Sequence, residues 1–363
     1  MRFYTRRSTA SLMAARSLGT AVALSMGDSR RESPMVLSPR RSPFISVSLV
    51  VVTCIVTVLP VAADAGASDD AVRVTAVANA TLRAAPSPDA PAVAQLPLGT
   101  EVRDASPAGL DKTWALVRLP DAREGWLQTR LTKPIDPVWR TEAFDAIIAE
   151  RLARTGDGFN ASAELVSFID RVAPEYGDPA SRATVALSRL RAVARAAAAI
   201  PAGGARREPY ASWLAARGSD LIYDEPGGRW IMQSAAIWDV HAAHRDVPAA
   251  DDIAWFAVTT GLAGECEGQV ACYFSAQNQL AGAYLRAHPF GRRAADAVRA
   301  VDDLLAAVAR EGRIHAPYSF DRTMDCQELT KAVDGLSAAI ETSRGTTAAT
   351  TVANLAAVRK MCR

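Results

Sequence analysis

The pattern of apolar and polar positions divides the chain into two regions. Between residues 72 and 134, short apolar alternations such as "VRVTAV", "TWALVRL" and "EGWLQT" are separated by Pro and Gly. This period of two predicts five short β-strands. From Asp136 onward, apolar residues recur every three or four positions, which predicts helices. We therefore expect a small all-β domain at 72–134 followed by a mainly α-helical domain at 136–363.

The helical region carries a series of apolar stripes, one through Phe144, Ile148 and Leu152 and another through Leu165 and Val172. Further helices are expected at about 179–200, 232–245, 250–262, 270–287, 292–311, 324–342 and 347–361. An acidic residue followed by proline at the first helical position is expected at Asp136-Pro137, Asp178-Pro179 and Glu208-Pro209. In "LIYDEPGGRWIM", Pro-Gly-Gly between two apolar triplets predicts a hairpin.

The β region contains an ordered series of apolar, proline and glycine positions: Leu82-Arg83-x-x-Pro86-Ser87, Val93, Leu96, Gly99, Val102, Trp114, Val117 and Gly125-Trp126-Leu127. In order and spacing this series resembles the bacterial SH3-like domain. Ala85 departs from the Gly that the family often has before the proline, but Ala tolerates the extended conformation required there. The resemblance implies a small barrel that closes its own edges, and an interaction module common in exported bacterial proteins that is often associated with the cell wall.

Trp114 and Trp126 are the candidate binding residues of this region, because they are its only aromatic residues. Recognition of a proline-rich peptide needs a groove lined by aromatic side chains, which two rings alone do not supply. The alternative is that both rings pack mainly on the barrel.

An apolar run from Phe44 to Ala63 follows Arg40-Arg41 and ends in Val61-Ala62-Ala63. This order predicts a secretory signal at 35–63 that is cleaved before Asp64, with Met35 as the true start and residues 1–34 upstream of it. We therefore expect an exported protein, periplasmic or secreted. A membrane is a partner only if the run is retained as an anchor, since its length approaches that of a spanning segment.

Removal of the signal changes the charge of the chain. Residues 1–63 hold eight arginines and two acidic residues, so 33 basic and 37 acidic residues remain and the net charge changes from +2 to −4. This balance does not support a basic surface for nucleic acid, and we expect no nucleic-acid partner.

Four cysteines remain once Cys54 leaves with the signal: Cys266, Cys272, Cys326 and Cys362. An even number in an exported protein favours two disulfides. Cys326 and Cys362 are equidistant from Arg344, and each stands at the end of an apolar helical stripe. Folding two helices antiparallel about "TSRGTT" brings this pair together. Cys266 and Cys272 then pair with each other, with Gly268 as the break in any helix between them.

The pair Asp325-Cys326 resembles the nucleophile motif of NlpC-type cell-wall peptidases, which often accompany SH3-like domains. That family needs a histidine base after the cysteine in the chain. All four histidines (241, 244, 288 and 315) precede Cys326, and Glu328 stands where the family usually has Gly. The motif therefore fails, and we expect no catalytic thiolate.

His241 and His244 are three residues apart on an expected helix, a spacing that suits zinc. Nothing nearby in the sequence supplies a third or fourth ligand, so we expect two partly buried helix histidines, and neither metal nor cofactor.

The densest aromatic region lies at 210–256, where carboxylates lie near the aromatic side chains in sequence. Its candidate glycan-cleft residues are Trp213, Tyr223, Glu225, Trp230, Trp238 and Asp239. Such a set can form a glycan cleft or a glycosidase pair; the alternative is a helical core with solvated acids.

These observations favour an exported, non-enzymatic binding protein whose SH3-like domain tethers the helical domain to peptidoglycan or to an envelope protein. One alternative is a cell-envelope hydrolase that uses the cluster at 210–256. Another is a protein-interaction scaffold, because residues 284–298 resemble the corner of tetratricopeptide-like repeats, although no second copy follows at a fixed period.

Overall fold

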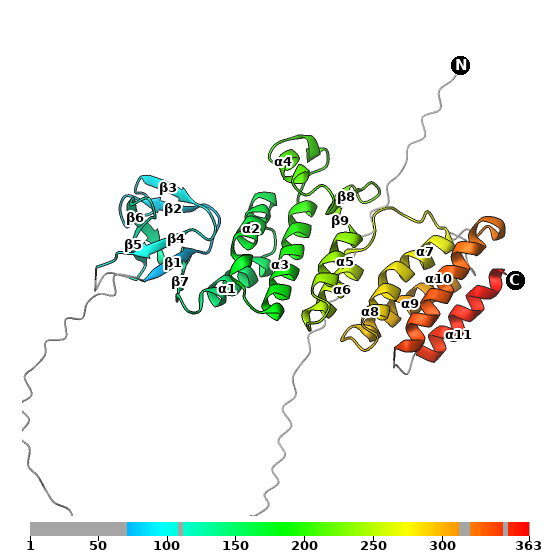
Figure 1. Cartoon of the computed structure of the whole chain (residues 1–363). Helices are drawn as coiled ribbons and strands as arrows, with labels where there is room; N and C mark the ends of the chain where they lie inside the picture. The colour runs from blue at the N-terminus through cyan, green and yellow to red at the C-terminus, as the bar shows by residue number, and fades with distance from the viewer. Residues whose placement is uncertain (1–70, 108–111, 312–319, 344–347, 363) are drawn as a thin grey trace, which may run out of the picture. The chain divides into compact units, whose positions relative to one another are not determined.

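The computed structural model describes residues 71–107, 112–311, 320–343 and 348–362. An antiparallel sheet region comes first and a mainly helical region follows it (Figure 1), so the expected order of fold classes is confirmed. The expected signal segment and its cleavage site lie outside the described residues. Within the described ranges, no helix combines the length and the apolar character that crossing a membrane requires.

The sheet contains seven strands in the order β3-β2-β6-β5-β4-β1-β7, and the neighbouring strands are antiparallel. The strands are β1 (Val72–Thr75), β2 (Ala80–Arg83), β3 (Ala92–Leu96), β4 (Glu101–Asp104), β5 (Trp114–Arg118), β6 (Glu124–Gln128) and β7 (Thr132–Ile135). The expectation of five strands missed β2 and β7. β7 contains Pro134, which is tolerated because β7 is an edge strand.

Alternate residues of the sheet build its core. Ala115, Val117 and Leu127 are buried in one cluster with Leu82 and Val102, among others. Because side chains alternate between the two faces of a strand, the residues between these positions lie on the opposite face. The register pairs Leu116 with Trp126, so these two side chains share that outer face.

The sheet region is fastened to the helix α2 (Phe159–Val172) through the turn at Leu98-Gly99. The Leu98 N–H donates to Glu164 Oε1 (2.6 Å), and the Leu98 carbonyl accepts from Arg171 Nη2 (2.6 Å). Leu98 is only 1% exposed and is buried in the same cluster as Phe168 of α2. The sheet and the first helices thus share one apolar core.

The remaining helices follow the expected periodicity closely. They are α1 (Arg140–Ala153), α3 (Pro179–Ala198), α4 (Tyr210–Ala215), α5 (Ser234–Ala243), α6 (Ala249–Thr260), α7 (Val270–Gln277), α8 (Ala283–Ala287), α9 (Ala294–Glu311), α10 (Arg322–Thr342) and α11 (Ala348–Arg359). The expected single helix at 270–287 is interrupted by a π-turn, η4 (Asn278–Gly282). At this turn Arg286 donates to the side chain and the carbonyl of Asn278, at 2.8 and 2.9 Å.

Only one of the three acidic-proline starts is correct. Pro179 is the first residue of α3, and Asp178 caps the helix by accepting from the Ser181 N–H (2.9 Å). The expectation is wrong for Asp136-Pro137, since Asp136 instead accepts from the Val138 N–H within a turn and α1 begins at Arg140. It is also wrong for Pro209, which precedes the first residue of α4.

The expected hairpin is present, as β8 (Leu221–Asp224) paired with β9 (Arg229–Met232). The described part of the helical region buries two large apolar clusters. One extends from the sheet region to α6, and the other joins residues of α6 to α11. Trp238 of α5 packs against both clusters and therefore lies where they meet.

Candidate functional site

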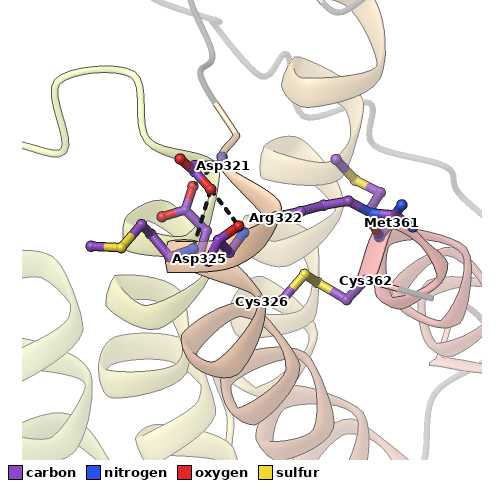
Figure 2. Close-up of a disulfide and its surroundings, with 8 residues drawn as sticks. Asp321, Arg322, Asp325, Cys326, Met361 and Cys362 are labelled. Atoms are coloured by element: carbon purple, nitrogen blue, oxygen red, sulfur yellow. Dashed lines mark hydrogen bonds between the residues drawn. A yellow bond between two sulfur atoms is a disulfide. The ribbon is translucent and has the colours of Figure 1, made fainter.

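Cys326 is bonded to Cys362 (Figure 2), with Cα atoms 5.4 Å apart. It lies in the first turns of α10, whose N-terminus Asp321 caps by accepting from the N–H groups of Thr323 (2.8 Å) and Met324 (3.2 Å). Asp325 accepts in turn from the Asp321 N–H at 2.7 Å, so its carboxylate is occupied with capping. Cys326 is therefore half of a disulfide that joins α10 to the segment after α11, as the hairpin symmetry predicts. The residues at the hairpin turn, 344–347, lie outside the described ranges.

Cys266 and Cys272 form the second disulfide, also with Cα atoms 5.4 Å apart. The loop between them contains Gly268 at φ +85°, a conformation that glycine adopts without strain. The bond lines a cleft of about 630 Å³ whose described charged residues are Glu265 and Glu328, both exposed. Both disulfides thus close local elements, and the structure shows no thiolate at any of the four positions.

Trp114 and Trp126 lie on the outer face of the sheet. They belong to the neighbouring strands β5 and β6, and Trp126 is paired with Leu116 in the register. Both rings are half-buried, yet neither packs against a buried apolar cluster of the described residues. Diagonal neighbours on one face of a sheet are within reach of each other when the side chains are aromatic. Trp114, Leu116 and Trp126 therefore form one apolar strip, which we call the tryptophan face.

The aromatic residues of the candidate glycan cleft make three separate ring contacts among the described residues. Trp213 packs edge-on against Phe159 at 5.3 Å, and the Arg217 guanidinium lies 4.3 Å from the centre of the Trp213 ring. Trp238 packs edge-on against His241 at 5.0 Å. Tyr223 and Trp230 face each other across the hairpin, with ring centres 5.5 Å apart.

The carboxylates of this region lie apart from those rings, bonded elsewhere or exposed. Asp224 is buried, and its Oδ1 accepts from the Gly264 N–H (3.0 Å), which ties the hairpin to a loop 40 residues away. Glu225 is exposed in the hairpin turn, and Asp239 is exposed on α5. The hydrolase expectation rests on such a pair and stays a prediction.

Tyr223 and Trp230 form one wall of a pocket of about 450 Å³. The opposite wall comes from the end of α3 and the turn after it, through Pro201 and Arg206. Neither Glu225 nor Asp239 is among the described residues that line this pocket. Sequence reasoning found the two rings but missed Arg206, since nothing in a turn rich in glycine and arginine marks one arginine as different from its neighbour Arg207.

His241 is paired with His288, with their Nε2 atoms 2.8 Å apart. One ring lies in the last turn of α5 and the other at the end of α8, and both are half-buried. Burial lowers the pKa of both imidazoles, and for His241 the neighbouring ring of His288 adds to this effect. The zinc spacing drew attention to His244 as the partner of His241, but the contact is made with a histidine 47 residues away.

A buried acid lies beside this pair. Asp251 is 9% exposed and accepts hydrogen bonds from the Tyr284 hydroxyl and from the Arg292 N–H (2.8 Å). The Tyr284 oxygen also accepts from the Arg293 N–H (3.0 Å). Burial acts to raise the pKa of Asp251, but the two hydrogen bonds that it accepts, together with the charges of His288 and Arg292, lower the pKa overall. The hydrogen bonds among Asp251, Tyr284 and the backbone of Arg292 and Arg293 therefore hold the turn between α8 and α9 in place.

Across the described ranges, no three His, Cys, Asp or Glu side chains are grouped so as to hold a metal ion. Comparison with known proteins adds no relative: no family model matches the chain. No curated protein and no solved structure matches it either.

Proposed function

We propose that this protein is an exported, non-enzymatic binding protein of the bacterial cell envelope, whose β region is an SH3-like domain that binds peptidoglycan. The observation that carries the proposal is the tryptophan face. Two tryptophans and a leucine lie together on the outer side of the sheet without packing against a buried cluster. Half-buried aromatic rings on a sheet give a large apolar contact area, and their indole N–H groups remain available to a polar ligand.

The attachment of the sheet to α2 supports this role. Both backbone groups of Leu98 are bonded to α2, and Arg140 at the start of α1 bridges Glu101 of the sheet and Glu175. These contacts hold the sheet by its Leu98 turn and by β4. The tryptophan face, on β5 and β6, is formed by other strands. A rigid mount of this kind reduces the ordering cost of binding.

The state of the cysteines supports a role without bond cleavage. Nucleophilic catalysis by cysteine needs a thiolate, and a disulfide sulfur has no ionisable proton. Cys326, the residue that resembles a peptidase nucleophile, is bonded to Cys362. The two disulfides also fit an oxidising compartment outside the cytoplasm.

The test is binding of the purified exported protein to isolated peptidoglycan, with Trp114→Ala and Trp126→Ala as variants. We expect each variant to weaken binding about tenfold or more, as for aromatic residues at the centre of an interface. Trp139→Ala is the matched control, because Trp139 is 58% exposed and lies outside the sheet. Unchanged binding by both variants, with melting temperatures equal to that of the wild type, would reject the tryptophan face as the binding surface.

A further inference from the structure

The pocket beside the β8–β9 hairpin combines two aromatic rings with an arginine side chain. Its volume of about 450 Å³ falls within the range of small-molecule sites. The hairpin contributes Tyr223 and Trp230, and the segment after α3 contributes Pro201 and Arg206. These elements are separate from the tryptophan face, so a ligand in this pocket does not depend on the proposed peptidoglycan binding.

Packing contacts set the positions of the two aromatic rings. Trp230 packs against a small buried cluster that contains Phe159 and Ile200, and Ile200 also lines the pocket. Tyr223 is its cross-strand neighbour, 36% exposed, and its ring is tilted by 59° to that of Trp230. The two rings therefore offer a partly exposed apolar surface whose position is set by the hairpin ladder and by the end of α3.

The described residues that line this pocket carry a positive charge and no negative charge. Arg206 is the only charged residue among the described residues that line it, and no described residue forms a hydrogen bond or ion pair with the exposed guanidinium of Arg206. The nearby carboxylates are engaged elsewhere or lie outside the pocket: Asp224 accepts from Gly264, and Glu208 accepts from Ser212. The guanidinium thus has its full set of donors available to an anion, and it binds a carboxylate best because both oxygens can be engaged at once.

The rim of the pocket leaves room for a ligand. Gly203 and Gly228 stand on it, at φ +71° and +61°, where residues with side chains are strained. A Cβ at either position would meet no atom within 4 Å. The rim therefore carries no side chain at these two points.

We propose that this pocket binds an acidic sugar residue, of the hexuronic acid class, from an envelope or extracellular polysaccharide. The apolar C–H face of a pyranose ring packs on Tyr223 and Trp230, while the sugar carboxylate pairs with Arg206. The carboxylate of a hexuronic acid projects from the edge of the ring. A wall of aromatic faces with a guanidinium to one side matches that arrangement, whereas a purely apolar ligand leaves Arg206 unused.

The test compares two ligands that share the same sugar rings: tri-galacturonic acid, which carries carboxylates, and its fully methyl-esterified form, in which each carboxyl is a neutral ester. NMR titration of the purified exported protein measures both affinities, with the indole N–H signal of Trp230 as the reporter. We expect the free acid to bind roughly fivefold more tightly than the ester, because exposed ion pairs are modest in strength. Arg206→Gln is expected to make the two affinities equal, and Tyr223→Ala to weaken both.

Arg207→Gln is the matched control, since Arg207 is adjacent, exposed and outside the pocket. It is expected to keep the preference for the free acid, and melting temperatures confirm that all variants are folded. Two results overturn the proposal: equal binding of acid and ester by the wild type, or a preference that Arg206→Gln leaves intact. Binding of an acetylated peptide with a free C-terminal carboxylate, without binding of the sugar, also overturns it and assigns the pocket to a peptide end.

Discussion

The Nε2 atoms of His241 and His288 lie 2.8 Å apart and join α5 to the end of α8. A hydrogen bond between two imidazoles needs one N–H and one bare nitrogen, so it is lost when both rings are protonated. Trp238 and Tyr284 pack around the pair, Asp251 is bonded to Tyr284, and Arg292 is bonded to Asp251. The pair thus links elements on either side of the place where the two helical clusters meet.

We expect the stability of the protein to fall as the pH is lowered from about 7.5 to about 5. The pKa of each histidine is lowered in the folded state from its ordinary value of 6.5. The unfolded chain therefore binds protons more readily, and stability that is present above pH 6.5 is lost on acidification. Asp251 does not interfere, because its lowered pKa places its titration below this window. Thermal melts as a function of pH measure the effect.

The double variant His241→Gln/His288→Gln isolates the pair, since glutamine does not titrate. Its melting temperature is expected to depend less on pH between about 7.5 and 5 than that of the wild type. His244→Gln, at the end of the same helix but outside the pair, is expected to keep the full dependence. A double variant with the same slope as the wild type contradicts a role for the pair.

Tyr284→Phe tests the hydrogen bonds of the buried acid. The change removes the donor to Asp251 Oδ1 and the acceptor for the Arg293 N–H, while Asp251 Oδ2 keeps its bond from the Arg292 N–H. We expect a loss of about 2–3 kcal/mol in the free energy of unfolding, measured by denaturant titration. Tyr223→Phe is the control, because the exposed Tyr223 hydroxyl has no hydrogen-bond partner among the described residues, and it is expected to be nearly neutral.

Gly99→Ala tests the attachment of the sheet to α2. Gly99 has φ +76°, and a Cβ there would lie 2.2 Å from Cδ2 of Phe168. Strain and overpacking together are expected to lower the unfolding free energy by about 2–4 kcal/mol. Gly156→Ala separates the two causes, because Gly156 has a similar φ of +83° but open space around it. We expect that control to lose only about 1 kcal/mol, and equal losses at the two positions would contradict a close contact between Gly99 and α2.

Removal of each disulfide by paired Cys→Ser substitution tests how much that disulfide stabilises the fold. Cys326–Cys362 spans 36 residues and Cys266–Cys272 spans six. In the chain-entropy model, their removal costs about 3–4 and about 2 kcal/mol, respectively. Denaturant titrations of the two double variants measure these losses. Peptide mapping without reductant that joined Cys266 to Cys326 or Cys362 would contradict the pairing itself.

The features that the sequence predicts best are those set by local periodicity. The stripes from Cys326 and toward Cys362 run along single helices, so counting from Arg344 was enough to pair the two cysteines. Contacts between distant segments were not accessible in this way. Nothing in the spacing of His241 points to His288, and the Leu98 turn has the composition of a surface loop although it is buried against α2.

The candidate site was predictable only as a set of residue types. Trp114 and Trp126 were recognisable as the only aromatic residues of the β region, but their common face depends on the register of β5 and β6. In the region 210–256, the rings and the carboxylates are neighbours in sequence and yet separate in space. Tyr223 faces the pocket, while Asp224, next to it on the strand, is turned toward Gly264. Successive side chains of a strand point to opposite faces, so this separation follows from the strand itself. Predicting the separation therefore requires that the strand be assigned first.

Co-sedimentation with isolated peptidoglycan, together with measurement of soluble fragments, tests the central claim most directly. The purified exported protein is mixed with the wall material, and the pelleted protein, the turbidity and the released sugar are measured. We expect the protein in the pellet, constant turbidity and no released fragments, because the protein binds the wall without cutting it. Clearing of the suspension that disappears with Glu225→Gln or Asp239→Asn would contradict the account and identify a hydrolase, and protein that stays in the supernatant would contradict binding to the wall.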